Sequence, residues 1–404
     1  MIIPSYWGRK KGEDAKRSDS VYDHPTPLDE DGTLKRLLQS LSILENKEFH
    51  LVILGVATAE DIRQDVEAKL CSLFKNTSSP VQPILFTYSQ LDEIHSHLNE
   101  TGHAQHIPLL QLNGYSNVRN LCTFIPHILG SETAILIDDD EIFEDKDFMH
   151  KALEHIGKTK NGDDIFGVAG FYINPDNDFF LNREITPWMT YWNKIDCMNR
   201  AFAKFIDEEP RLKITPFAFG GNLILHRNLF TQIPFDPSVP RGEDIDFLIN
   251  ARMFGYPIYL DNTLSIKHEP PPKSSPTWRR VREDIVRFVF EKNKLDAQEP
   301  RPRMTKVSAE DLEPYPGEYL KPDLEERIFR SNQMLASEYL TEGYPEGAVE
   351  CLKNIQLAKT ALESDENPFQ KLCLLQDQWK DLMEYFSSES VRQDIRERIG
   401  SLSL

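Results

Sequence analysis

The sequence of 404 residues contains little cysteine and no long apolar run. No two of its five cysteines have the Cys-x-x-Cys spacing of a zinc or redox site; they are Cys71, Cys122, Cys197, Cys351 and Cys373. An odd number of scattered cysteines favours reduced thiols over a disulfide framework. The sequence also lacks a run of about 18 apolar residues and a signal-peptide pattern. We therefore expect a cytoplasmic protein, or at most one that is peripheral to a membrane.

Basic residues are outnumbered by acidic ones. The chain has 46 Lys and Arg against 65 Asp and Glu, which gives a formal net charge of −19. Because the summed field of such a surface repels polyanions, nucleic acid and anionic membranes are disfavoured as non-specific partners. The hydrophobic content of 40% is that of an ordinary globular protein, and the length predicts more than one domain.

Strand and helix patterns alternate over the first 290 residues, which is the order of a mainly parallel sheet flanked by helices. We expect strands at residues 1–6, 49–55, 81–87, 134–137, 166–173, 222–226 and 258–266. We expect helices at residues 34–44, 59–74, 90–99, 121–129 and 246–254. Residues 7–32 form an unusually long polar loop, and loops of that length are usually functional or disordered.

The character of the chain changes after residue 292. Two proline-rich stretches at 298–303 and 313–322 indicate a linker, and the residues from 324 to about 399 have helical periodicity. The sequence therefore predicts an α/β domain at 1–295, a linker at 296–322 and a helical C-terminal region at 323–404. The C-terminal helices either pack against the first domain or join copies of the chain into a homo-oligomer.

Three adjacent carboxylates follow an apolar run that is typical of a buried strand. The run at 134–137 ends at Asp138, Asp139 and Asp140. Ligands of open α/β sheets bind at the carboxyl ends of strands. Like charges side by side need solvent or a cation, and oxygen ligands suit Mg²⁺ or Mn²⁺. The alternative is an acidic turn that only ends the strand and caps the next helix.

Further motifs surround this strand in a fixed order. They are NGYSNVRN at 113–120, FGGN at 219–222, RGEDIDF at 241–247 and KHEP at 267–270. Together with the opening strand, this set resembles the nucleotide-sugar glycosyltransferases of the GT-A fold, particularly the family-2-like group. The resemblance covers roughly residues 1–290. It implies a Rossmann-like, mostly parallel sheet, a DXD-type metal site and metal-dependent transfer of a hexose from a nucleotide-diphosphate sugar to a hydroxyl of a glycan or small-molecule acceptor.

The resemblance also implies roles for single residues. Asp138 would reach the nucleotide ribose, and Asp140 would bind a divalent cation, Mn²⁺ or Mg²⁺, at the donor diphosphate. His268 follows the last strand, and a neutral imidazole is a good ligand for Mn²⁺. The donor-binding residues implied in this way are Pro4, Tyr6, Arg119, Asp138, Asp139, Gly220, Gly221 and Asn222.

We expect Glu243 and Asp244 to stand at the start of a helix, where the helix dipole and free N–H groups favour carboxylates. That preference alone accounts for the two carboxylates if their role is only to stabilise the helix. The resemblance instead implies that Asp244 is the general base for the acceptor and that Glu243 orients the acceptor. This role requires an enzyme that inverts the anomeric carbon, and the sequence does not decide the stereochemistry.

One departure from the family concerns the nucleotide base. Many members have an Asp-Asp-Gly-Ser turn after the second strand, whereas residues 54–60 read LGVATAE here. The base is therefore not predicted, and the 7–32 loop is a candidate for contacting it.

Two other functions remain open. One is a sugar-phosphate nucleotidyltransferase, for which residues 8–12 (GRKKG) are a loose match to a Gly-rich basic signature. The other is a non-catalytic carbohydrate-binding protein on a degenerate fold. The aromatic residues Trp188, Tyr191 and Trp192 either stack on a sugar acceptor or belong to the core.

Overall fold

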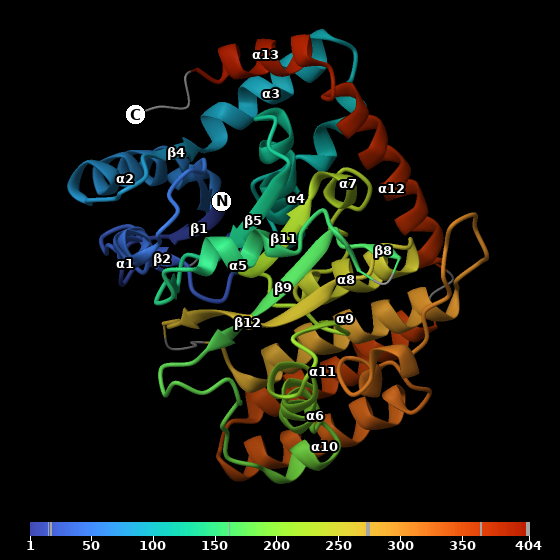
Figure 1. Ribbon diagram of the computed structural model, residues 1–404. Coiled ribbons are helices and arrows are strands. Elements are labelled where there is room, and N and C mark those ends of the chain that lie inside the picture. Colours follow the sequence, from blue (N-terminus) through green and yellow to red (C-terminus); the bar gives the residue numbers. More distant parts are fainter. Residues whose placement is uncertain (15, 17, 161, 272–274, 364–365, 401–404) are drawn as a thin grey trace.

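A single large sheet organises the computed structural model, which describes residues 1–14, 16, 18–160, 162–271, 275–363 and 366–400 (Figure 1). Ten strands of the described residues form it. Its main path runs in the order β10 (Leu212–Ile214), β12 (Tyr259–His268), β9 (Gly167–Ile173), β11 (Asn222–His226), β5 (Thr133–Ile137), β1 (Ile2–Gly8), β3 (Leu51–Ala57) and β4 (Pro83–Phe86).

Most neighbouring strands of this sheet are parallel. β1 pairs in parallel with β3 and β5, β3 with β4, and β9 with β12. β11 is antiparallel to both β5 and β9, and β10 is antiparallel to β12. The remaining short strands are β2 (Thr26–Pro27) beside β1, β6 (Glu141–Ile142) beside β12, and the separate hairpin β7 (Thr159–Lys160) and β8 (Asp163–Asp164). The α/β fold class predicted from the sequence, a mostly parallel sheet flanked by helices, is confirmed.

Both faces of the central strands are buried. Adjacent residues of β3 point to opposite faces, so Ile53 and Leu54 enter two different apolar clusters. On the side of Ile53 lie α1 (Leu34–Ser40), α2 (Arg63–Asn76) and α5 (Phe148–Glu154). On the side of Leu54 lie α3 (Tyr88–Glu100) and α4 (Tyr115–Ile128). Burial on both faces explains why the strand sequences are continuous apolar runs.

A third cluster forms at the other end of the sheet. Phe171 on β9 and Leu260 on β12 pack there with α6 (Lys194–Phe202), α8 (Glu243–Met253) and α9 (Thr277–Asp296). The helix α7 (Arg227–Phe230) follows β11. Short irregular helical segments occupy Leu41–Ile43, Glu60–Ile62, Ala104–Leu109, Pro187–Thr190, Ala203–Asp207, Glu310–Leu312 and Gly317–Tyr319.

Two helices begin earlier than their apolar periodicity indicates. α4 starts at Tyr115 and α8 at Glu243, directly after Gly114 and Gly242, which have φ of +75° and +78°. Glycine adopts this left-handed conformation without a Cβ clash, so it turns the chain into the helix. The polar first turns therefore belong to the helices, and apolar patterning alone does not detect them.

The C-terminal helices share the apolar clusters of the sheet. They are α10 (Leu324–Thr341), α11 (Pro345–Leu362), α12 (Pro368–Tyr385) and α13 (Glu389–Arg398). Figure 1 shows α10 and α11 beside α9, and α12 running along one side of the molecule to α13, which lies over α3. Trp379 on α12 is buried in the cluster of α3 and α4, and its indole Nε1–H donates to the Phe230 carbonyl at 2.8 Å. The helical C-terminal region is confirmed.

The stretch predicted as a linker is packed against the rest of the protein. Leu312, Tyr315 and Tyr319 are buried, and they belong to the cluster around α9. The boundaries at residues 295 and 323 stay a prediction, as does association of copies through the C-terminal helices. Residues 15 and 17 of the long loop, and 364–365 and 401–404 of the C-terminal region, lie outside the described residues. Within the described ranges, no helix is both long and apolar enough to cross a membrane.

Candidate active site

The motifs that are distant in the sequence meet at one edge of the sheet. β9 and β12 run in the same direction as β5, so Tyr172 and His268 lie at the same edge as the acidic residues after β5. β11 runs the other way, and its first residue, Asn222, pairs with Ile137 at the end of β5. The glycines before β11 therefore reach the same place. This is the edge at which α/β proteins bind ligands.

A cavity of about 1080 Å³ opens at this edge. Small-molecule pockets usually measure roughly 300–1,000 Å³, so this one has room for two ligands of moderate size. Its lining includes most of the residues that the sequence singled out: Pro4, Tyr6, Arg119, Asp138, Asp139, Asp140, Gly220, Glu243, Asp244 and His268. Gly221 and Asn222 do not belong to the lining.

Arg119 joins two of the acidic motifs. Its Nη2 lies 2.7 Å from Asp138 Oδ1, and its Nε lies 3.3 Å from Glu243 Oε1. The side chain is 4% exposed. Burial opposes the charged form, but the two carboxylates outweigh it and raise the pKa of Arg119 further. A buried cation between two anions fixes the position of both, because separating any of the three would leave an unpaired buried charge.

The glycines before β11 make room for these charged groups. A Cβ atom on Gly220 would lie 2.7 Å from Arg119 Nη2. A Cβ atom on Gly221 would lie 2.6 Å from Asp138 Cγ and would overlap the Glu141 carboxylate. The resemblance implied that these glycines bind the donor. In the structure, their missing side chains let the acidic strand end and Arg119 approach the backbone.

Asn222 has a role inside the sheet. Its side chain is fully buried, and Nδ2 donates to the carbonyls of Phe171 and Leu264 at 3.3 and 3.0 Å. The register between β9 and β12 shifts between Leu260 and Ser265, next to this amide. A side chain that satisfies backbone carbonyls between strands does not reach the cavity. We therefore withdraw Asn222 as a donor ligand.

Asp140 and His268 face each other across the cavity edge. His268 Nε2 lies 3.4 Å from Asp140 Oδ2, and the imidazole stacks on the Tyr172 ring at 4.5 Å between centroids. Burial would raise the pKa of Asp140, but the hydrogen bond and charge of His268 outweigh it and lower this pKa. The carboxylate is thus kept ionised and oriented toward a basic nitrogen.

Asp139 points toward β1. Its Oδ2 accepts a hydrogen bond from Ser5 Oγ at 2.6 Å, and Ser5 Oγ in turn accepts one from Trp7 Nε1 at 2.9 Å. Burial, with Asp140 nearby, raises the pKa of Asp139 well above its usual range. A carboxyl with these partners connects the acidic strand end to β1.

The donor atoms of Asp140 and His268 fit a divalent cation incompletely. A carboxylate oxygen and an imidazole nitrogen are suitable ligands for Mn²⁺, and the carboxylate also suits Mg²⁺. In the part of the chain that the structure describes, no group of three or more His, Cys, Asp or Glu residues forms a metal site. An ion held by these two side chains would need further oxygen ligands, such as those of a bound diphosphate and water.

Asp244 is held by backbone donors at the start of α8. Its Oδ2 accepts from the Gly220 N–H at 3.1 Å, and its Oδ1 accepts from the Ile245 N–H at 2.8 Å. Burial raises the pKa of Asp244 in spite of these bonds. For Glu243, burial and the neighbouring Asp244 raise the pKa to about 7. Perturbed carboxyls in a cavity are candidates for proton transfer.

The long loop after β1 supplies lining residues that no sequence motif revealed. Tyr22, Asp23 and His24 line the cavity. The rings of Tyr6 and Tyr22 lie 4.4 Å apart, and Tyr115 on α4 completes a three-ring cluster at 5.4 and 5.1 Å. The length of the loop was the only sequence signal for this contribution.

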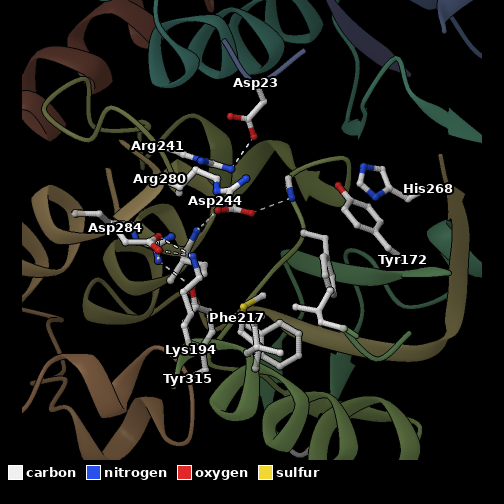
Figure 2. Close-up of a pocket in the computed structure, with 18 of the residues that line it drawn as sticks. Asp23, Tyr172, Lys194, Phe217, Arg241, Asp244, His268, Arg280, Asp284 and Tyr315 are labelled. Carbon is white, nitrogen blue, oxygen red and sulfur yellow. Dashed lines mark hydrogen bonds and ion pairs between the residues drawn. The ribbon is translucent and has the colours of Figure 1, made fainter. Parts of the chain in front are cut away.

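The opposite wall of the cavity carries positive charge. Figure 2 shows Tyr172 and His268 on one side of Asp244, and Lys194, Arg241, Arg280 and Asp284 on the other. Lys194 Nζ lies 2.7 Å from Asp284 Oδ1, and Arg241 Nη2 lies 2.6 Å from Asp23 Oδ2. Burial lowers the pKa of Lys194 to about 8.

Trp188 and Trp192 belong mainly to the core. They touch the cavity, but they are 4% and 3% exposed, and Trp192 packs edge-on against Tyr319 at 4.9 Å. Of the two roles that the sequence left open for these rings, the structure favours packing.

Comparison with known proteins gives a likeness of fold only. No family model matches the chain, and no curated protein matches its sequence. Among solved structures, a mannosyltransferase from Pyrobaculum calidifontis, in complex with GDP-Man and Mn²⁺, is 13% identical with a TM-score of 0.44, over 96% of this chain and 85% of that one. Glucosyl-3-phosphoglycerate synthase from Mycobacterium tuberculosis, in complex with Mn²⁺, UDP and phosphoglyceric acid, is 15% identical with a TM-score of 0.34, over 67% and 70% of the two chains. GalNAc-T7, with UDP, GalNAc and Mn²⁺, is 13% identical with a TM-score of 0.34, over 85% and 58%. So distant a likeness assigns no activity, donor or acceptor to this chain.

Proposed function

We propose that this protein is a metal-dependent glycosyltransferase that moves a hexose from a nucleotide-diphosphate sugar to a hydroxyl of a glycan or small-molecule acceptor. The observation that carries the proposal is the convergence of three separate motifs on one cavity. The pair Asp140 and His268 lies at one side of Asp244, and a second, basic wall lies at the other. One cavity thus offers a place for a donor and a place for an acceptor.

The donor would occupy the side of the acidic strand end. Asp140 and His268 would hold Mn²⁺ or Mg²⁺, and the ion would neutralise the charge that grows on the leaving diphosphate. Asp138, fixed by Arg119, is the candidate for a hydrogen bond from the ribose. The ring cluster of Tyr6, Tyr22 and Tyr115 offers the base an aromatic surface, and it takes the place of the acidic turn that is missing after β3.

The acceptor would approach Asp244 from the basic wall. Both oxygens of this carboxylate accept a backbone N–H, so the group is oriented before the acceptor binds. In the proposed reaction, Asp244 takes the proton of the attacking hydroxyl as the bond to the anomeric carbon forms. Glu243, tied to Arg119, links this base to the donor side. A base on the face opposite the leaving group implies inversion of the anomeric carbon.

The test is release of nucleoside diphosphate from UDP-, GDP- and ADP-hexoses in the presence of a panel of acceptors, with Mn²⁺ or with EDTA. We expect release from one donor class, dependent on metal, that Asp140→Asn abolishes. Asp164→Asn is the matched control, because Asp164 is an exposed carboxylate on β8 outside the cavity. Full metal-dependent activity of Asp140→Asn would refute the metal assignment.

The nucleotidyltransferase alternative receives less support. Its loose signature at residues 8–12 contains Arg9, whose guanidinium pairs with Asp19 at 2.7 Å and Asp61 at 2.8 Å. Arg9 does not belong to the cavity lining. A cation neutralised in this way, away from the cavity, has no charge left for a triphosphate.

A cytoplasmic location, with or without peripheral attachment to a membrane, also remains our proposal.

A further inference from the structure

Two arginines of the basic wall have no carboxylate partner among the described residues. Arg183, in the segment before α6, and Arg280, on the first turn of α9, both line the cavity. Neither takes part in an ion pair within 4.0 Å in the described ranges, and the side-chain hydrogen bond found for Arg280 goes to Thr277 Oγ1 at 3.0 Å. Arg183 is exposed and Arg280 is half-buried, so both guanidinium groups are open to solvent and to a ligand that enters the cavity.

The neighbouring cations are different, since each is neutralised. Lys194 pairs with Asp284, and Arg241 pairs with both Asp23 and Glu283. Arg287 lies 3.5 Å from Asp284 Oδ1 and 3.8 Å from Glu291 Oε1. The unpaired character is thus specific to Arg183 and Arg280 and is not a property of the whole wall.

The two guanidinium groups repel each other. Arg183 is exposed on its outer side, and its partial desolvation at the cavity together with the charge of Arg280 lowers its pKa, while Tyr339 and Glu338 on α10 act in the opposite direction. Two like charges that share one cavity, with no carboxylate of the described residues in an ion pair with either, are stabilised by an anionic ligand. Arginine is suited to this, because its planar fork binds carboxylate and phosphate oxygens in pairs.

The position of Arg280 separates it from the proposed donor side. Arg280 lies on the opposite side of Asp244 from His268 and Tyr172 (Figure 2). Thr277, the first residue of α9, also lines the cavity, so the positive end of this 20-residue helix adds to the field at the same place. The acidic strand end, in contrast, surrounds the proposed donor diphosphate and its cation.

We infer that Arg183 and Arg280 form an anion subsite for the acceptor, so that the acceptor is a hydroxyl compound that carries a carboxylate or a phosphate. This inference rests on the proposed function, which places the acceptor beside Asp244. A neutral glycan chain would leave both arginines unpaired in the complex. The binding energy of the anion would be used to position the hydroxyl at Asp244.

The test is calorimetric titration of the full chain with a matched series of glycerol, glycerate and glycerol phosphate. These probes share a hydroxylated three-carbon frame and differ in the anion, so the series also separates carboxylate from phosphate. We expect binding of at least one anion and none of glycerol. Arg183→Gln and Arg280→Gln should each weaken anion binding about tenfold or more, which is the usual effect of removing one charge-assisted hydrogen bond. Arg279→Gln, which changes the neighbouring arginine of α9 outside the cavity, should leave it unchanged.

A second titration separates this inference from the proposed function. Nucleoside diphosphates with Mn²⁺ are titrated into the same variants, and we expect the affinity of wild type in all of them. Parallel loss of nucleotide and anion binding would overturn the inference, because the arginines would then hold the donor. Equal binding of glycerol and the anions, no binding of any anion, or full anion binding by both variants would also overturn it. Anion binding without any nucleotide binding would leave the subsite standing and refute the glycosyltransferase proposal.

Discussion

His127 connects α4 to the C-terminal helix α12 and makes this contact sensitive to pH. Its side chain is 2% exposed, and Nε2 lies 2.8 Å from the Met383 carbonyl, to which it donates as the neutral tautomer. Nδ1 is buried and has no hydrogen-bond partner in the described part of the chain. Burial lowers the pKa of His127 to about 4, the hydrogen bond to Met383 opposes this, and the charges of Arg227 and Arg392 add to it.

The sign and size of the effect follow from linkage. The folded-state pKa lies below the usual value of 6.5, so the unfolded chain binds more protons between pH 6.5 and about 4. The free energy of unfolding therefore falls as the pH drops below 6.5. One pKa unit corresponds to about 1.36 kcal/mol, so His127 should contribute a loss of about 2 kcal/mol between pH 8 and pH 5.

The assay is urea denaturation of wild type and His127→Gln at both pH values. Glutamine keeps a donor near the Met383 carbonyl but does not titrate. The variant should lose about 2 kcal/mol less than wild type over this pH range. Three other histidines with lowered pKa, His97, His106 and His155, contribute to both proteins, so their effect cancels in the difference. Equal losses in the two proteins would refute the buried, neutral state of His127.

Three further predictions concern the cavity and the residues beside it. Arg119→Met leaves the buried Glu243 and the half-buried Asp138 without their cation, and we expect a loss of about 3 kcal/mol of unfolding free energy, measured by urea denaturation; a loss under 1 kcal/mol would contradict this reasoning. Gly221→Ala places a methyl group against the acidic strand end, so the unfolding free energy in urea should fall by about 1–3 kcal/mol. In the control Gly8→Ala, the added methyl group makes only ordinary contacts, so the unfolding free energy should change little. Asp244→Asn should lower kcat by about 10²–10⁴-fold in the transfer assay and leave nucleotide affinity unchanged, and wild-type turnover would end its assignment as the base.

The sheet was predictable because its central strands have distinctive apolar sequences. Apolar runs such as 134–137 can be buried only between two layers, and alternation with helical patterns predicts parallel pairing. The order of the motifs then placed Asp140, Asp244 and His268 at one edge. Apolar periodicity did not give the first turns of α4 and α8, because those turns are polar and depend on the conformation of Gly114 and Gly242.

Contacts between residues distant in the sequence could not be predicted from the sequence. Nothing near Arg119 indicates that it pairs with Glu243, and nothing in the long loop indicates that Asp23 pairs with Arg241. These pairs form because α4, the start of α8 and the loop after β1 all reach the edge of the sheet at which the cavity opens. The sequence motif also grouped Asn222 with its neighbours, although its amide donates to backbone carbonyls of β9 and β12 and does not line the cavity.

The central claim is tested most directly by calorimetric titration of UDP, GDP, ADP and CMP into the protein, each with and without Mn²⁺. We predict that one nucleoside diphosphate binds tightly only with metal. In the His268→Ala variant, Mn²⁺ should no longer increase the affinity for this nucleotide. Absence of binding for every nucleotide, with and without metal, would contradict the account and make the acidic strand end a structural feature.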